Sequence, residues 1–192
     1  MGGYGFGLVL FFSLLFWLPF PLSFAQQTSR SANFSVQTFS AADQRLLPRV
    51  FEVLQQARRD LIRRGLRPPE RVTLVIHPSL ESYTRTTRLP WFIAAVADRA
   101  KARIDTQRLR VLIERGSLER TLRHELFHLA QPQDWPRWKA EGMAMRFAGD
   151  KPTAAPFPGI SEAALERLLV DPPDQATLNR AMATAYRWAG RE

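Results

Sequence analysis

Two histidines and a glutamate in the middle of the chain carry the clearest chemical signal. His124, Glu125 and His128 form the pattern His-Glu-x-x-His. In a helix, side chains four residues apart lie on one face, so both imidazoles can bind one Zn²⁺ at roughly 2.0–2.1 Å. Glu125 is one residue along, where it flanks the ion without binding it and can take a proton from a zinc-activated water. The pattern predicts hydrolysis that uses one zinc per chain, with Glu125 as general base.

A catalytic zinc needs a third protein ligand and one open position. The chain contains no cysteine, and Glu141 follows His128 after thirteen residues. Pro132 and Pro136 predict a turn between two helices, which would return the first turn of the second helix to the metal. Gly142 is small and permits the two helices to approach closely. Glu141 is therefore the expected third ligand; the alternative is a solvated helix glutamate.

Residues 123–128 (RHELFH), followed by residues 136–144 (PRWKAEGMA), resemble the gluzincin metallopeptidases. The resemblance is to the small bacterial peptidase-MA-like group, in which the His-Glu-x-x-His pattern is followed by a short turn and W-x-x-E-G-x-A. It extends over about residues 71–147. The resemblance implies a zincin fold and an enzyme that hydrolyses peptide or protein substrates.

The resemblance also implies a set of roles. Zinc would be held by His124, His128 and Glu141, with Glu125 as the base. Two features depart from the family pattern. The spacing to Glu141 is shorter than in the large thermolysin-like members, and Met145 stands in place of a carboxylate that would orient a ligand histidine. Support for the ligands must therefore come from elsewhere. These departures keep open an alternative function, a catalytically inactive zinc-binding envelope protein.

Asp134 is a competing third ligand. It stands six residues after His128, where metzincin peptidases place theirs. That class needs a glycine three residues after the second histidine for a sharp turn, and this chain has Gln131 there, followed by Pro132. Glu141 is therefore the favoured ligand.

Two further residues are weaker candidates. Gluzincins often direct a tyrosine or histidine donor at the developing oxyanion, and by this analogy Tyr186, in the last expected helix, is a candidate transition-state stabiliser. Packing is the alternative role for Tyr186. His77, beside Pro78, is expected to be a structural or surface histidine.

These residues must be positioned by helices and a small sheet. Residues 26–39 are polar and are expected to be a tether, and residues 40–192 an α+β zincin-like domain. In it, a small early sheet would pack against the active-site helix and the C-terminal helices. Periodicity and breakers predict strands near 71–76, 91–97 and 102–106. They predict helices over about 41–62, 79–83, 117–130, 138–148, 161–170 and 175–189.

The first 25 residues contain no charged side chain, and an apolar run from Leu8 to Phe20 precedes Ser23-Phe24-Ala25. Small residues at Ser23 and Ala25 resemble a signal-peptidase site, so residues 1–25 are expected to be a cleaved signal peptide. The functional part would then be periplasmic or secreted, or membrane-anchored if the segment is retained.

Composition narrows the remaining functions. Lys and Arg number 27 against 18 Asp and Glu, for a net charge of +9. The arginines are scattered, so nucleic-acid binding is not expected. Weak contact with anionic membranes or cell-wall polymers is a modest expectation. The absence of cysteine excludes disulfides, thiolate metal sites and a cysteine nucleophile. The sequence does not indicate an oligomeric state.

Overall fold

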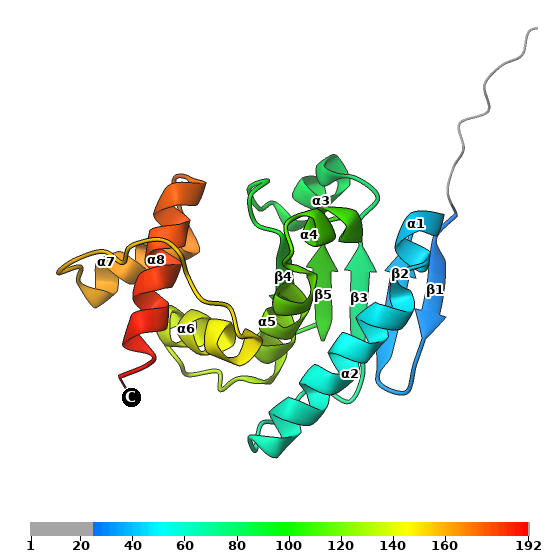
Figure 1. Cartoon of the computed structure of the whole chain (residues 1–192), viewed down its shortest axis with the longest axis horizontal. Coiled ribbons are helices and arrows are strands. Elements are labelled where there is room, and N and C mark those ends of the chain that lie inside the picture. The colour runs from blue at the N-terminus through cyan, green and yellow to red at the C-terminus, as the bar shows by residue number, and fades with distance from the viewer. Residues whose placement is uncertain (1–24, 192) are drawn as a thin grey trace, which may run out of the picture.

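Figure 1 shows the computed structural model, which describes residues 25–191. The signal peptide expected over residues 1–25 lies outside this range except for Ala25. Five strands form one sheet: β1 (Gln27–Arg30), β2 (Phe34–Thr38), β3 (Val72–Ile76), β4 (Ala95–Asp98) and β5 (Arg103–Thr106). The helices are α1 (Ala41–Gln44), α2 (Leu47–Arg63), α3 (Leu80–Thr87), α4 (Leu109–Glu114), α5 (Leu118–Ala130), α6 (Arg137–Ala148), α7 (Glu162–Val170) and α8 (Gln175–Trp188). The mixed α+β class predicted from the sequence is confirmed.

The sheet has the strand order β1-β2-β3-β5-β4. Strands β2, β3 and β5 are parallel, and the two edge strands, β1 and β4, each run antiparallel to their neighbour. A short connection joins β4 to β5, and the two strands pair antiparallel as a hairpin. Among the strands of residues 25–191, β4 pairs only with β5, so its other edge pairs with no strand of that part of the chain.

The prediction of a tether over residues 26–39 is wrong, because this segment forms β1 and β2. Phe34, Val36 and Thr38 are buried, while Ser35 and Gln37 between them are only partly buried. This alternation is the period of a half-buried strand. The apolar side chains of β2 are too few to stand out in a mostly polar segment, and its parallel partner, β3, lies more than thirty residues later.

The main core lies between the sheet and helices α2 and α5, which cross in front of the strands in Figure 1. On α2, Val50, Leu54, Ala57 and Leu61 recur at helical spacing and are fully buried. They belong to one cluster with strand residues and with the apolar face of α5. The sheet thus fixes α5, which carries both predicted histidine ligands.

The expected helix over residues 41–62 is divided into α1 and α2. Ser40 caps α1 by accepting a hydrogen bond from the Asp43 amide at 3.1 Å. Pro48 lies in the first turn of α2, where its missing N–H costs no helix hydrogen bond. Among residues 25–191, no helix combines the length and the apolar character needed to cross a membrane.

Helices α7 and α8 do not pack on the sheet, in contrast to the expected arrangement. They pack against α6, around a second cluster that contains Leu165, Leu169, Ala181 and Ala185. In Figure 1, α5 and α6 lie between the sheet and these last two helices. Residues of β4, α5, α6, α7 and α8 together line the cleft described below.

Candidate metal centre

Helix α5 presents its two histidines away from the core. Leu122, Leu126 and Leu129 anchor its apolar face in the main cluster. His124 and His128 are one turn apart, only partly buried, with ring centroids 4.7 Å apart. The apolar spacing therefore fixes which face of α5 meets the cleft, and the His-Glu-x-x-His pattern places both imidazoles on that face.

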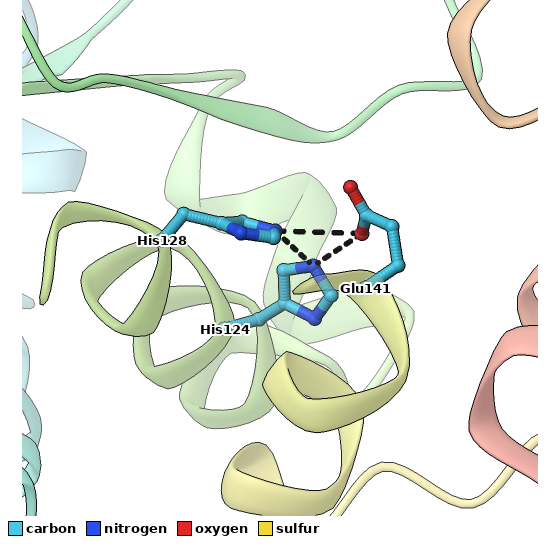
Figure 2. A group of neighbouring side chains, drawn as sticks. All are labelled: His124, His128 and Glu141. Carbon is cyan, nitrogen blue, oxygen red and sulfur yellow. Dashed lines mark hydrogen bonds and ion pairs between the residues drawn. The ribbon is translucent and has the colours of Figure 1, made fainter. Parts of the chain in front are cut away.

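Glu141 completes the group from α6 (Figure 2). Its Oε2 lies 3.1 Å from Nε2 of His124 and 3.4 Å from Nε2 of His128, and the two Nε2 atoms are 2.9 Å apart. A tetrahedral zinc with donors at about 2.1 Å would hold those donors about 3.4 Å apart. The three atoms therefore form a triangle of nearly the size that one face of a zinc tetrahedron requires.

The first turn of α6, which leads to Glu141, is fixed by α7. The residue before the helix is Pro136, whose side chain has no acceptor for the free backbone amides of the first turn. Glu166 of α7 does this, accepting hydrogen bonds from the backbone amides of Arg137 at 3.0 Å and Trp138 at 2.8 Å. Anchored amides at a helix start restrict its position, so Glu166 helps to fix where Glu141 lies.

Two residues outside this group orient its side chains. The amide oxygen of Gln131 lies 3.0 Å from Nδ1 of His128, so the ring donates from Nδ1 and turns Nε2 to the centre. Nε of Arg137 lies 2.8 Å from Oε1 of Glu141, which leaves Oε2 for the centre. The support missing at Met145 thus comes from Gln131 and Arg137.

The charges within the group are strongly coupled. Burial alone would lower the pKa of His128, but the neighbouring Glu141 carboxylate outweighs it and raises that pKa to about 9. Burial would raise the pKa of Glu141, but the charge of His128 and the hydrogen bonds from both histidines hold it well below its usual range. Without an ion, the Glu141 carboxylate favours the protonated form of His128, so a divalent metal would compete with a proton for that ring nitrogen.

A cleft of about 770 Å³ opens over His124, His128 and Glu141. Its walls come from the loop at residues 88–94 and from β4, from α5 and α6, and from the facing parts of α7 and α8. Glu125 lines this cleft, is 8% exposed, and makes no hydrogen bond or ion pair within residues 25–191. The cleft is therefore lined by the His124, His128 and Glu141 group, by the Glu125 carboxylate and by the β4 edge strand.

The weaker candidates lie elsewhere. Tyr186 is not among the residues that line the cleft, and its ring packs 4.3 Å from the Arg146 guanidinium. Its predicted role at the oxyanion therefore does not fit the structure, because its ring lies against Arg146 of α6 and outside the cleft. Asp134 is exposed and outside the ligand group, so the competing ligand assignment fails.

His77 is structural, as expected. It is buried, with Nε2 2.7 Å from Asp105 Oδ1 and Nδ1 3.2 Å from Ser82 Oγ, and it does not line the cleft. These hydrogen bonds join the end of β3 to β5 and α3.

Sequence reasoning missed three residues that support the site. Arg137 lies four residues before Glu141, a helix-neighbour spacing that could have revealed it. Gln131 was noticed only as the absence of a metzincin glycine. Glu166 has no local signal, because its contact with α6 spans 28 residues or more of sequence.

No protein-family model, curated protein or solved structure matches the chain.

Proposed function

We propose that this protein is an exported zinc-dependent peptidase with a zincin-like fold of the gluzincin type. The observation that carries the proposal is the convergence of one oxygen and two nitrogens, from consecutive helices, within 2.9–3.4 Å of one another at the base of a cleft. Two imidazoles and one carboxylate are the donor set of many catalytic zinc sites, and they leave a fourth position open.

Zinc, when bound there, would polarise the scissile carbonyl and make water a stronger acid. The chain itself supplies the base. Glu125 lies beside the two histidines in the sequence, and its carboxylate faces the cleft without a competing partner. It takes the proton of the attacking water and returns it to the leaving amine as the C–N bond breaks.

The free edge of β4 supports a peptide as the substrate. Residues 92–97, which include most of this strand, line the cleft. An unpaired strand edge presents main-chain N–H and C=O groups that can pair with an extended peptide irrespective of its side chains. A peptide added to this edge would run over α5 and place one of its bonds beside the ligands.

Replacement of Glu125 by Gln tests the mechanism. The variant is expected to bind zinc as the wild type does, because Glu125 is not a ligand, while cleavage of an unfolded protein such as casein falls by roughly 100-fold or more. Glu119→Gln is the matched control, since Glu119 is an exposed residue of the same helix. Undiminished cleavage by Glu125→Gln would refute the mechanism, and a zinc-loaded wild type that cuts nothing would favour the inactive zinc-binding alternative.

Export rests on the sequence of residues 1–25. N-terminal sequencing of the protein from the native host is expected to begin near Gln26. A cytoplasmic protein that begins at Met1 would refute export.

A further inference from the structure

Arg137 lies directly beside the candidate metal centre. Its Nε pairs with Oε1 of Glu141 at 2.8 Å, and this is the one ion pair of its side chain within residues 25–191. The two terminal nitrogens, Nη1 and Nη2, make no hydrogen bond in that part of the chain. The side chain lines the cleft and is 52% exposed. Arg137 therefore presents two unused N–H donors to whatever occupies the cleft.

The position of Arg137 is fixed at both ends. Its backbone amide donates to Glu166 at 3.0 Å, and its Nε is held by Glu141. A donor that is already in place before the reaction costs no reorganisation when charge develops, which is the property that makes such groups effective in catalysis. Arginine also keeps its charge throughout the physiological pH range.

The other arginines of the cleft are engaged elsewhere or lie in its loops. Arg120 pairs with Asp150 at 3.1 Å, and Arg99 donates to the carbonyl of Pro132 at 3.4 Å. Arg88 belongs to the loop that precedes β4. Among these cleft arginines, Arg137 is the one that pairs with Glu141, so its guanidinium lies directly beside the candidate metal centre.

We propose that Arg137 is a catalytic residue that stabilises the developing oxyanion, the role that Tyr186 does not reach; this rests on the peptidase function proposed above. As the water oxygen bonds to the scissile carbon, the carbonyl electron pair moves onto its oxygen, and Nη1 and Nη2 donate hydrogen bonds to that oxygen. Glu125 holds the proton from water and passes it to the amine when the C–N bond breaks. Arg137 remains protonated throughout.

The test must separate this role from support of Glu141. Arg137→Lys keeps a cation beside Glu141, but a single ammonium cannot both hold the ligand and reach the substrate as a guanidinium does. We expect this variant to retain zinc affinity within about threefold, while kcat at saturating zinc falls by roughly 100-fold, the usual cost of losing an oxyanion donor. KM should change little, because the interaction forms in the transition state.

A second readout does not depend on turnover. A phosphinic peptide mimics the tetrahedral, anionic transition state, whereas the uncleaved peptide of the same sequence, bound to Glu125→Gln, mimics the substrate. Calorimetry should show that Arg137→Lys lowers the affinity for the phosphinic peptide by roughly 100-fold. In the double variant, Glu125→Gln with Arg137→Lys, the affinity for the uncleaved peptide should fall by less than about threefold. Arg137→Met should show the same difference and also bind zinc more weakly.

The control is Arg110→Met. Arg110 makes the same kind of Nε ion pair, with Glu114 four residues on, in α4 and outside the cleft. The Arg110→Met variant should leave kcat unchanged.

Wild-type kcat in zinc-saturated Arg137→Lys, with undiminished binding of the phosphinic peptide, would overturn the proposal and leave Arg137 as a positioning residue. A wild type that cleaves no peptide, or an active Glu125→Gln variant, would instead refute the proposed function. Those two failures are therefore distinguishable.

Discussion

Replacement of Gly142 by Ala tests how closely the ligand helix packs on α8. A Cβ built at Gly142 would lie 2.6 Å from the Cβ of Ala189 and 2.7 Å from the carbonyl carbon of Ala185, and closer still to the oxygen of that carbonyl. Two of these three neighbours are backbone atoms, which cannot rotate away. Helix α8 must therefore move relative to α6.

The expected cost follows from two opposing effects. Forcing a methyl group into a packed contact costs about 3 kcal/mol at the upper end of the usual range. Replacing a helical glycine by alanine returns about 1 kcal/mol. The net loss is about 2 kcal/mol, which for a chain of this size lowers the melting temperature by roughly 4–8 °C. Urea and thermal denaturation of the metal-free protein would measure it.

Gly190→Ala is the control. A Cβ at Gly190 falls on the guanidinium end of the exposed Arg146 side chain, which can move aside but then gives up its hydrogen bonds to the Tyr186 carbonyl. The loss in Gly190→Ala should therefore stay at about 1 kcal/mol or less, below that of Gly142→Ala. Equal stability losses in the two variants, or no loss in Gly142→Ala, would refute the argument that backbone contact between α6 and α8 fixes the ligand helix.

Three further predictions concern the supporting residues. Gln131→Leu removes the Nδ1 hydrogen bond of the second histidine ligand, so zinc affinity should fall by roughly 10–100-fold in a chelator competition, and unchanged affinity would contradict the orienting role. Glu166→Ala leaves two amides at the start of α6 without their acceptor, so urea denaturation should show a loss of about 1–2 kcal/mol; no loss would show that the cap is unimportant. Burial would raise the pKa of Asp105, but hydrogen bonds from His77 and Arg103 hold it below the unfolded value of 3.8. Its stabilisation is thus present above that pH and is lost as the pH falls through the folded-state pKa. Asp105→Asn should therefore lose less stability than the wild type between pH 5 and pH 2, and equal losses in both proteins would contradict this.

The parts of the site that were predicted correctly depend on local patterns. Helix α5 was expected over residues 117–130 and α6 over 138–148, each within one residue of the structure. Leucine spacing and the Pro132 and Pro136 breaks are sufficient for this. Glu141 followed from the shortage of other ligands, and the structure brings it to both histidines.

The parts that were missed depend on contacts between distant segments. Strand β2 is recognisable only with β3 beside it, so the polar residues around Phe34 predicted a tether. The position of Tyr186 depends on how α8 rotates against Gly142, and no periodicity within α8 specifies that angle. The cap from Glu166 to α6 likewise joins helices that are separated by a long loop.

The central claim is that His124, His128 and Glu141 bind one zinc ion together. Metal analysis of the purified protein after addition of one equivalent of zinc and gel filtration, with chelator competition for the affinity, tests it most directly. The wild type and the exposed control Glu119→Ala should each retain one zinc per chain. Glu141→Ala should lower the affinity for zinc by more than the roughly 10–100-fold expected when a ligand loses a hydrogen-bond partner such as Gln131. Full zinc affinity in Glu141→Ala, or no zinc retained by the wild type, would contradict the account.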